Sequence, residues 1–188
     1  FYYAVNGTLD RDGLYSTVLN GGSERIFEGS GFSCLFSFDG TLYGVQNGSV
    51  RAFSLENGEA SLTGYEIGAG SDAPDRISDA GDAVRSGDLL VIADRGNRRV
   101  LVYDGAEERY CKKEPYAHNA ESTVSGLTCV YGTYYYVTEH NYYGVAEAGA
   151  REFTRPGSAM PVAITSDMQG NLYVASAAGQ VSRFTESE

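Results

Sequence analysis

A unit of two apolar, strand-like runs around a Gly-containing turn recurs along the whole chain, about every 42 residues. The clearest copy is Gly87–Asp104, in which Leu89–Ala93 and Val100–Tyr103 flank a polar linker that contains Gly96. Aligned on an aromatic or aliphatic residue in mid-strand, the copies are centred on Tyr3, Tyr43, Val91, Tyr136 and Tyr173. Val, Ile, Leu and Tyr suit a pleated, half-buried surface, and a short Gly-containing linker between two such runs indicates a β-hairpin.

Short apolar segments on either side of the hairpins predict two further strands for each unit. The segments before a hairpin predict the first strands: Cys34–Gly40, Asp82–Asp88, Leu127–Gly132 and Ala163–Gly170. Those after a hairpin predict the outer strands: Ile26–Gly29, Leu62–Ile67, Arg109–Tyr116 and Arg151–Arg155. No window of about 11 residues keeps apolar residues at helical spacing. The predicted fold class is therefore all-β, a β-propeller with about five visible blades of roughly 42 residues.

The length of the chain is that of one domain. It has 188 residues, and no Pro- or Ser-rich linker divides it. We therefore expect a single propeller domain over residues 1–188. The chain starts on the expected second strand of one blade and stops after the third strand of another. The expected ring is thus incomplete at both ends, either because further sequence completes it or because the predicted strand phase is displaced.

Two Asn-Gly pairs stand at matching places in the first two units. Asn6-Gly7 and Asn47-Gly48 each follow the mid-strand run of a unit. Asn-Gly is the favoured pair for a two-residue hairpin turn, because both central residues of that turn have positive φ. Both pairs also start an N-glycosylation pattern, but the turn explains both occurrences without a glycan. We therefore predict a two-residue turn at each pair.

The hairpin sequence ADRGNRRVLVYD, Ala93–Asp104, resembles an NHL repeat, whose hairpin follows approximately ADxGNxRVxVFD. The matching residues are Asp94, Gly96, Asn97, Arg99, Val100 and Tyr103. Gln169–Ser176 resembles the strand that enters the same hairpin but lacks the Asn and the Arg. The resemblance implies a β-propeller, commonly six-bladed, that serves as a binding or scaffolding platform. Some related propellers are metal-dependent lyases or lactonases, so the resemblance does not fix an activity.

The polar residues of this hairpin also have a physical interpretation of their own. Gly96 and Asn97 tolerate the positive φ that a tight turn demands. Asp94 can accept hydrogen bonds from backbone N–H groups of the turn or from Arg99, whose guanidinium can otherwise bind a carbonyl of the next blade. We interpret Asp94, Asn97 and Arg99 as a structural pin of the hairpin, with ligand contact as the alternative.

A polar side chain stands three residues after each anchor. These residues are Asn6, Gln46, Asp94, Glu139 and Ser176. Units related by rotation would place the five in a ring on one face, near the central opening, where loops from every blade converge. We predict that this ring binds the ligand or partner. The alternative is that each side chain satisfies the backbone of its own hairpin.

Asp79 and Asp82 are the candidate metal ligands. They lie on or beside a predicted first strand, where carboxylates facing the channel could hold a hard cation such as calcium. Their spacing follows no known calcium loop, and solvated loop carboxylates with a strand-end cap are the alternative. We expect no other cofactor. The chain has two histidines, without HExxH or GxSxG spacing, so no catalytic residue is predicted.

Charge and cysteine usage restrict the partners. The 14 Lys and Arg stand against 25 Asp and Glu, a formal charge of −11, which disfavours nucleic acid and anionic membrane surfaces. No apolar run approaches the roughly 20 residues of a membrane helix, so no direct membrane insertion is expected.

Cys34, Cys111 and Cys129 form no disulfide framework, and their redox state stays open. The Tyr-, Gly- and Ser-rich, Lys-poor composition favours a surface or secreted location.

The sequence as a whole favours a non-catalytic binding or scaffolding propeller. Its partner would be a protein or a small polar ligand, bound on the face that carries the ring of polar side chains. A metal-dependent propeller lyase or lactonase is the alternative, and it would need several carboxylates and amides around a cation in the channel.

Overall fold

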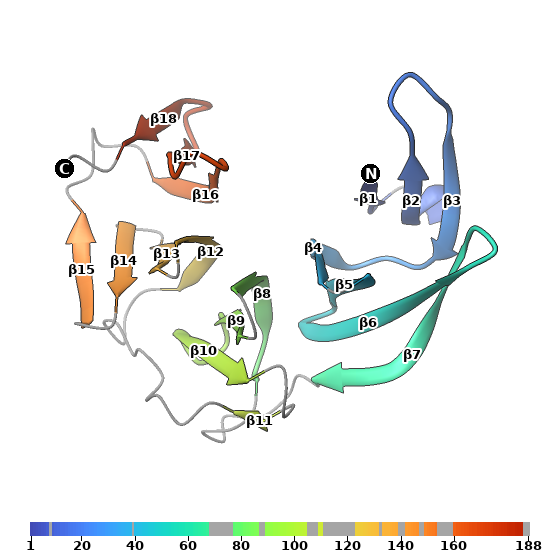
Figure 1. The fold of residues 1–188 in the computed structure, drawn as a ribbon, viewed down its shortest axis with the longest axis horizontal. Coiled ribbons are helices and arrows are strands. Elements are labelled where there is room, and N and C mark those ends of the chain that lie inside the picture. The colour runs from blue at the N-terminus through green and yellow to red at the C-terminus, as the bar shows by residue number, and fades with distance from the viewer. Residues whose placement is uncertain are drawn as a thin grey trace. The chain divides into compact units, whose positions relative to one another are not determined.

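The computed structural model describes residues 1–7, 9–38, 40–67, 77–86, 89–104, 109–110, 123–131, 133–138, 142–146, 149–153 and 160–185. In these residues the protein is a series of five small antiparallel sheets that follow one another along the chain (Figure 1). The described helix is a single 3₁₀ turn, η1 (Leu9–Arg11), and no described helix is long and apolar enough to span a membrane. The prediction of an all-β propeller fold is confirmed.

Each sheet is a meander in which consecutive strands pair. The first sheet has β1 (Tyr2–Val5), β2 (Gly13–Thr17) and β3 (Ser23–Glu28), and the second has β4 (Phe32–Phe38), β5 (Thr41–Gln46), β6 (Ser49–Glu56) and β7 (Glu59–Ile67). The third has β8 (Ala80–Ser86), β9 (Leu89–Asp94), β10 (Arg99–Asp104) and β11 (Arg109–Tyr110). The fourth has β12 (Val124–Val130), β13 (Thr133–Thr138), β14 (Tyr142–Ala146) and β15 (Gly149–Phe153). The fifth has β16 (Pro161–Ser166), β17 (Leu172–Ser176) and β18 (Val181–Phe184). The second, third and fourth sheets begin and end where their first and outer strands were expected.

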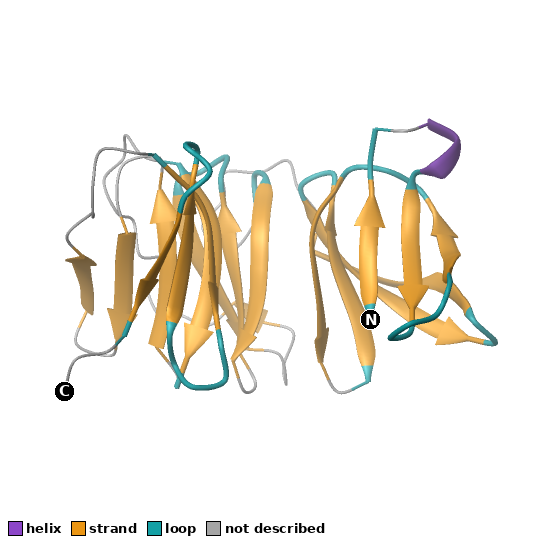
Figure 2. Ribbon diagram, turned by 90° about the horizontal axis from the view of Figure 1, so that it is seen from above, coloured by secondary structure: helices purple, strands orange, loops and turns teal. Residues whose placement is uncertain are grey.

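The chain forms two compact units, Phe1–Ala80 and Gly81–Glu188. In the first unit, β1 and β3 of the first sheet contact β4 and β7 of the second. In the second unit, the fourth sheet contacts the third through β12 and β9, and it contacts the fifth through β12, β13 and β16. Within each sheet the strands run up and down beside one another (Figure 2). A single domain over residues 1–188 stays a prediction.

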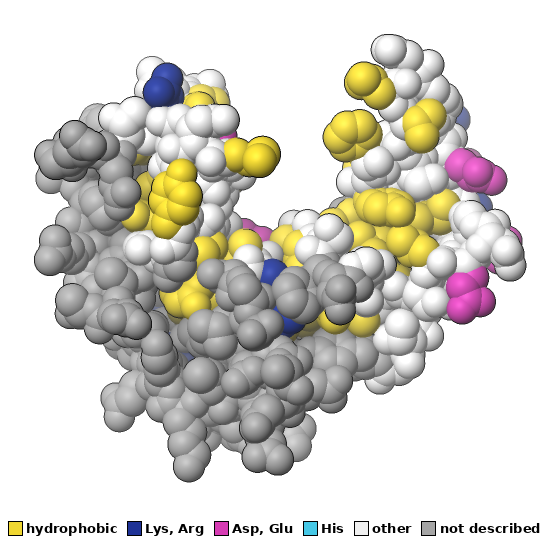
Figure 3. All heavy atoms as spheres, viewed as in Figure 1, with side chains coloured by type: hydrophobic (Ala, Val, Ile, Leu, Met, Phe, Trp, Pro, Cys, Tyr) yellow, Lys and Arg dark blue, Asp and Glu magenta, His cyan; other side chains and the backbone are white. Residues whose placement is uncertain are grey.

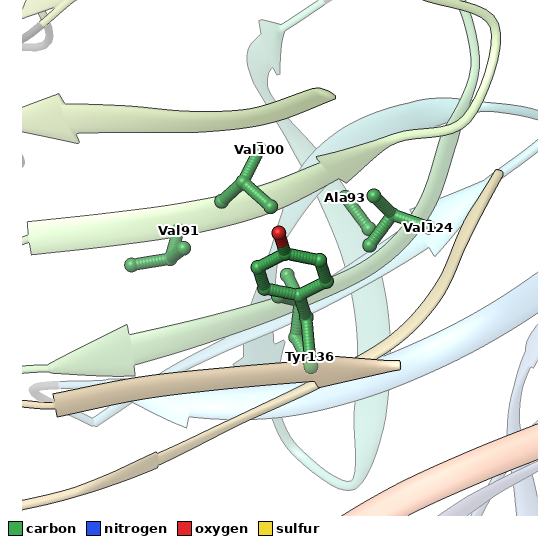
Figure 4. Close-up of a cluster of buried hydrophobic side chains, with 6 residues drawn as sticks. Val91, Ala93, Val100, Val124 and Tyr136 are labelled. Atoms are coloured by element: carbon green, nitrogen blue, oxygen red, sulfur yellow. The ribbon is translucent and has the colours of Figure 1, made fainter. Parts of the chain in front are cut away.

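The core lies between consecutive sheets, because both faces of an inner sheet are apolar. Between the first two sheets the buried residues are Leu14, Ile26, Phe32, Leu42, Phe53 and Ala60. Between the third and fourth they are Val91, Ala93, Val100, Val124, Leu127 and Tyr136 (Figure 4). Between the fourth and fifth they are Val130, Tyr135, Val137, Ile164 and Val174. Tyr135 and Tyr136, which are consecutive in β13, thus pack on opposite faces of the fourth sheet, one toward each neighbouring sheet.

Three first strands carry a β-bulge at the same place. The register shifts between Phe32 and Cys34, between Val124 and Gly126, and between Pro161 and Ala163. The residue before each bulge pairs with the last residue of the second strand. These last residues are Gln46, Thr138 and Ser176. An extra residue at this point bends the strand and increases its twist locally. Equivalent positions in these sheets can therefore be counted from the bulge.

The register shows that the sequence alignment was displaced by one residue in two units. Ala93 and Val137 are the next-to-last residues of their second strands, and each packs in the cluster shared with the following sheet. Ala4 is next to last in β1 and packs toward the second sheet in the same way. The strand ends Val5 and Thr138 are therefore the positions equivalent to Asp94, rather than Asn6 and Glu139. A one-residue displacement exchanges the two faces of a strand, so the anchors Tyr3 and Tyr136 were on the wrong face.

Only one of the two predicted Asn-Gly turns is a two-residue hairpin. Asn47 and Gly48 have φ of 51° and 77°, and Gln46 pairs with Ser49 directly across them. The prediction is wrong for Asn6-Gly7, because Val5 pairs with Gly13 and the connection between them contains the 3₁₀ turn. The length of the connection, rather than the Asn-Gly pair itself, decides the turn type.

Candidate functional site

The pin of the β9–β10 hairpin is built around a buried carboxylate. Asp94 Oδ2 accepts hydrogen bonds from Arg99 Nε at 2.9 Å and from Asn97 Nδ2 at 2.8 Å. The side chain of Asp94 is fully buried, and Arg99 is 8% exposed. Asp94 and Arg99 are also cross-strand partners, so the ion pair closes the hairpin where the loop begins. The contact between them is the one that the sequence suggested for a structural pin, and it is charge-assisted.

The backbone of this turn differs from the expectation. The positive φ belongs to Arg98, at 54°, and neither Gly96 nor Asn97 has one. The loop has four residues, and the N–H of Arg98 donates to the carbonyl of Arg95 at 3.2 Å. Four-residue hairpin loops are most often built around such a turn. The predicted positive φ at Gly96 and Asn97 is therefore wrong, because it assumed a tighter loop, and the Asn97 amide serves Asp94 instead.

Three of the predicted ring residues are the last residues of their second strands, and each makes hydrogen bonds to residues near that end of the strand. Gln46, which is 5% exposed, donates from Nε2 to the carbonyl of Ser30 at 2.9 Å and accepts from Arg51 Nη1 at 3.1 Å. Ser176 Oγ accepts from the N–H of Gln180 at 3.3 Å. Asp94 binds Asn97 and Arg99 as described above. Of the three, Ser176 binds the backbone of its own hairpin, as the structural alternative expects, whereas Gln46 binds a carbonyl that precedes β4 and Asp94 binds side chains. Ligand binding by the ring stays a prediction.

The other two predicted ring residues have different outcomes. Asn6 binds the backbone of Phe32 in the next sheet twice: its Nδ2 donates to the carbonyl at 2.8 Å, and its Oδ1 accepts from the N–H at 3.0 Å. Asn6 therefore joins the first sheet to β4. Glu139 and Cys111 lie outside the described residues, and within the described part of the chain Cys34 and Cys129 are not joined in a disulfide.

Side chains also join the sheets of the second unit, and sequence reasoning missed these contacts. Asp82 Oδ2, on β8, accepts from the N–H of Leu127 on β12 at 2.8 Å. The hydroxyls of Thr128 on β12 and Ser166 on β16 are 2.8 Å apart. The sequence holds no signal for these contacts, because the partners are 45 and 38 residues apart and one of them is a backbone group.

Asp82 was also a candidate metal ligand, with Asp79. Its second oxygen, Oδ1, accepts from the N–H of Ala83 at 2.8 Å, so both carboxylate oxygens receive backbone hydrogen bonds. Asp79 is half-buried. Within the described part of the chain, no group of three or more His, Cys, Asp or Glu side chains is placed to hold a metal ion. Calcium binding by Asp79 and Asp82 stays a prediction.

Replacing Asp82 with alanine is expected to lower the free energy of unfolding by about 1.5–3 kcal/mol, because the buried N–H of Leu127 loses a charged acceptor. Urea denaturation of the purified variant measures the loss. Asp82→Asn is the matched control: it keeps the size and one acceptor oxygen, and it should lose less. Equal stability of the alanine variant and the wild type would contradict a role in joining the sheets.

A second carboxylate organises the turn between β16 and β17. Asp167 Oδ1 accepts from the N–H groups of Gln169 and Asn171, both at 2.9 Å. Its Oδ2 accepts from Asn171 Nδ2 at 2.7 Å and from the hydroxyl of Tyr173 at 2.9 Å. The hydrogen bond from the Asn171 side chain is the main cause that lowers the pKa of Asp167, and desolvation opposes it in part. The same contact raises the pKa of Tyr173, because the phenol donates to the carboxylate.

The lowered pKa of Asp167 predicts a pH-dependent contribution to stability. A carboxylate whose pKa is lower in the folded state stabilises the fold above its unfolded-state pKa, and it loses that contribution as the pH falls through the folded-state value. We expect the stability difference between wild type and Asp167→Ala to be constant above about pH 5 and to shrink below about pH 4. Urea denaturation over a pH series tests this. A difference that stays constant under acid would contradict it.

Comparison with known proteins identifies the fold. No protein-family model matches the sequence, and no curated protein is significantly similar to it. Among solved structures, the chain is similar to virginiamycin B lyase from Staphylococcus aureus, with 15% identity and a TM-score of 0.63 over 92% of this chain and 62% of that one. It is also similar to U3-55K, with 16% identity and a TM-score of 0.65 over 87% of this chain and 55% of the other. The WD40 repeats of RRP9 are similar as well, with 16% identity and a TM-score of 0.65 over 85% of this chain and 53% of that one. The chain thus spans less than two thirds of each of these proteins, and the likeness shows that its fold is that of a β-propeller.

Proposed function

We propose that the chain is a non-catalytic binding or scaffolding β-propeller with NHL-like blades. Its partner, a protein or a small polar ligand, lies over the face where the second strands end. The observation that carries the proposal is the use of the polar side chains there. Gln46 binds the carbonyl of Ser30, Asp94 binds two side chains of its own hairpin, and Ser176 binds the N–H of Gln180. We therefore expect the loops at the ends of these second strands, called the rim here, to be stiff.

A stiff rim favours binding, because a preorganised surface loses little conformational entropy when a partner docks. The acidic composition favours a basic protein patch or a cationic ligand over nucleic acid. In this proposal Asp94 and Gln46 stabilise the loops of the rim and do not contact the partner, because both side chains are buried. Asn6, Ser176 and Glu139 are the members of the predicted ring that would contact the partner.

A metal-dependent propeller lyase is the second candidate. The observation in its favour is the likeness to virginiamycin B lyase over 92% of this chain. That likeness is one of fold, and a propeller fold carries many functions, so the two candidates need a direct test. They differ in one measurable property, which is whether a tightly bound metal ion is part of the native protein.

The test is the thermal stability of the protein after chelation and after addition of Ca²⁺, Mg²⁺, Mn²⁺ or Zn²⁺ in turn. A ligand at about 100 times its Kd adds roughly 2.7 kcal/mol to the folded state, which raises Tm by several degrees. Under the binding proposal Tm stays unchanged with each ion. A saturable rise in Tm that is lost in Asp79→Asn/Asp82→Asn would overturn it in favour of the lyase.

A further inference from the structure

Two neighbouring turns of the second unit expose large apolar side chains at the end of the strands opposite to the proposed rim. Tyr131, in the turn between β12 and β13, is 78% exposed, and Met168, in the turn between β16 and β17, is 93% exposed. We call these two side chains the Tyr–Met tip. Hydrophobic side chains protrude at several places on the described surface (Figure 3). The tip differs from isolated exposed residues because its two turns touch.

The two turns touch through a glycine. A Cβ added to Gly170 would lie 2.8 Å from Tyr131 Cε2 and 3.4 Å from Val130 Cγ1, so the ring lies against the turn that carries Met168. Gly170 also has a φ of +84°, a conformation that other residues rarely adopt. The fourth and fifth sheets therefore present Tyr131 and Met168 on one continuous surface.

Hydrogen bonds hold the turn between β16 and β17 in one conformation. The N–H of Gly170 donates to the carbonyl of Asp167 at 3.2 Å, and the Asp167 carboxylate accepts four further hydrogen bonds within the same hairpin. Tyr131 has a φ of 46°, which is unusual for a bulky residue. The hairpin itself requires this conformation, because Val130 pairs with Thr133 across a two-residue turn. The tip is thus exposed, and the turn that carries Met168 is fixed by hydrogen bonds.

We propose that the Tyr–Met tip is a docking site for a basic peptide segment of a protein partner. Tyrosine and methionine are enriched at the centres of protein interfaces, and a rigid presentation limits the entropy lost on binding. The formal charge of −11 attracts a basic segment. Among the described residues of the two turns, Asp167 is the charged side chain, while Arg183 lies at the base and donates to Asn171 Oδ1 at 3.1 Å. The Tyr131 ring receives a Lys or Arg side chain through a cation–π contact, and Met168 packs on an apolar residue of the segment.

The two methionines of the chain provide matched reporters. Met160 lies at the opposite end of the β16–β17 hairpin, where its carbonyl accepts from the N–H of Ala177. At about 3.3 Å per residue, β16 separates Met160 from Met168 by roughly 20 Å. In protein labelled with ¹³C at the methionine methyls, a peptide at the tip shifts the Met168 signal and leaves Met160 unchanged. A peptide at the proposed rim does the opposite, so the two proposals fail independently.

The probe is a library of short random peptides, selected on the whole chain with Tyr131→Ala/Met168→Ala as counter-selection. We expect enriched peptides that combine Lys or Arg with an apolar residue, shift only the Met168 methyl, and bind the double variant at least about ten-fold more weakly. Exchange of their basic residues for Glu should weaken binding by a similar factor. No enrichment over the variant, equal affinity for both proteins, or a shift at Met160 alone would overturn the proposal. If the double variant does not fold, the test is repeated with Met168→Ser alone, because this substitution changes only a side chain that is 93% exposed.

Discussion

Arg99→Leu is expected to lower the free energy of unfolding by about 3–5 kcal/mol, one of the two largest losses that we predict. The substitution leaves the Asp94 carboxylate fully buried without the guanidinium that is 2.9 Å away from it. A buried charge deprived of its partner keeps the cost of its desolvation and loses the attraction that offset it. Urea denaturation followed by circular dichroism measures the loss.

Two further variants separate the ion pair from ordinary side-chain packing. In the second sheet Arg51 binds the neutral Gln46 at 3.1 Å, so Arg51→Leu should cost only about 0.5–1.5 kcal/mol. The double variant Asp94→Leu/Arg99→Leu removes both charges and should regain much of the stability lost in Arg99→Leu. If Arg99→Leu costs no more than Arg51→Leu, the pin does not stabilise the fold in the way that its geometry indicates.

Tyr136→Ala is expected to cost about 3–5 kcal/mol as well, because it removes a fully buried ring from the cluster between the third and fourth sheets. Figure 4 shows the ring among Val91, Ala93, Val100 and Val124, so its loss leaves a cavity lined by short side chains. Thermal and urea denaturation of the variant measure the effect.

Tyr131→Ala is the matched control for this substitution, since Tyr131 precedes the same strand but is 78% exposed. It should change the stability by no more than about 0.5 kcal/mol. A loss at Tyr136 as small as that at Tyr131 would show that the face assigned to β13 is wrong.

The sequence predicted the order of the strands well, because each unit combines apolar strand runs with turns at a regular period. It failed by one residue at Tyr3 and Tyr136, and the reason is the run of similar residues at each place. In Tyr2-Tyr3 and in Tyr134–Tyr136, consecutive residues on opposite faces are of the same type. Alternation between apolar and polar residues sets the register of a strand, so a uniform run leaves the register open.

The candidate site was predictable only where both partners stand in one hairpin. Asp94 and Arg99 are five residues apart, and their charges alone suggested the contact. Asp82 binds a backbone N–H that is 45 residues away, which no local pattern encodes. The Asp167 hydrogen bonds are local, but the sequence offers several aspartates near turns and does not distinguish this one.

The bulges in the first strands affect how such a repeat can change in length. Past each bulge the pairing is fixed by the hairpin turn, as in Cys34 with Val45 and Gly126 with Val137. A residue gained or lost before the bulge therefore alters the connection from the preceding sheet and leaves every later pair in place. Mutational drift can then accumulate in the spacing between units while the packed faces stay matched. Evolutionary comparison of these units should accordingly be anchored at the turn rather than at a constant period.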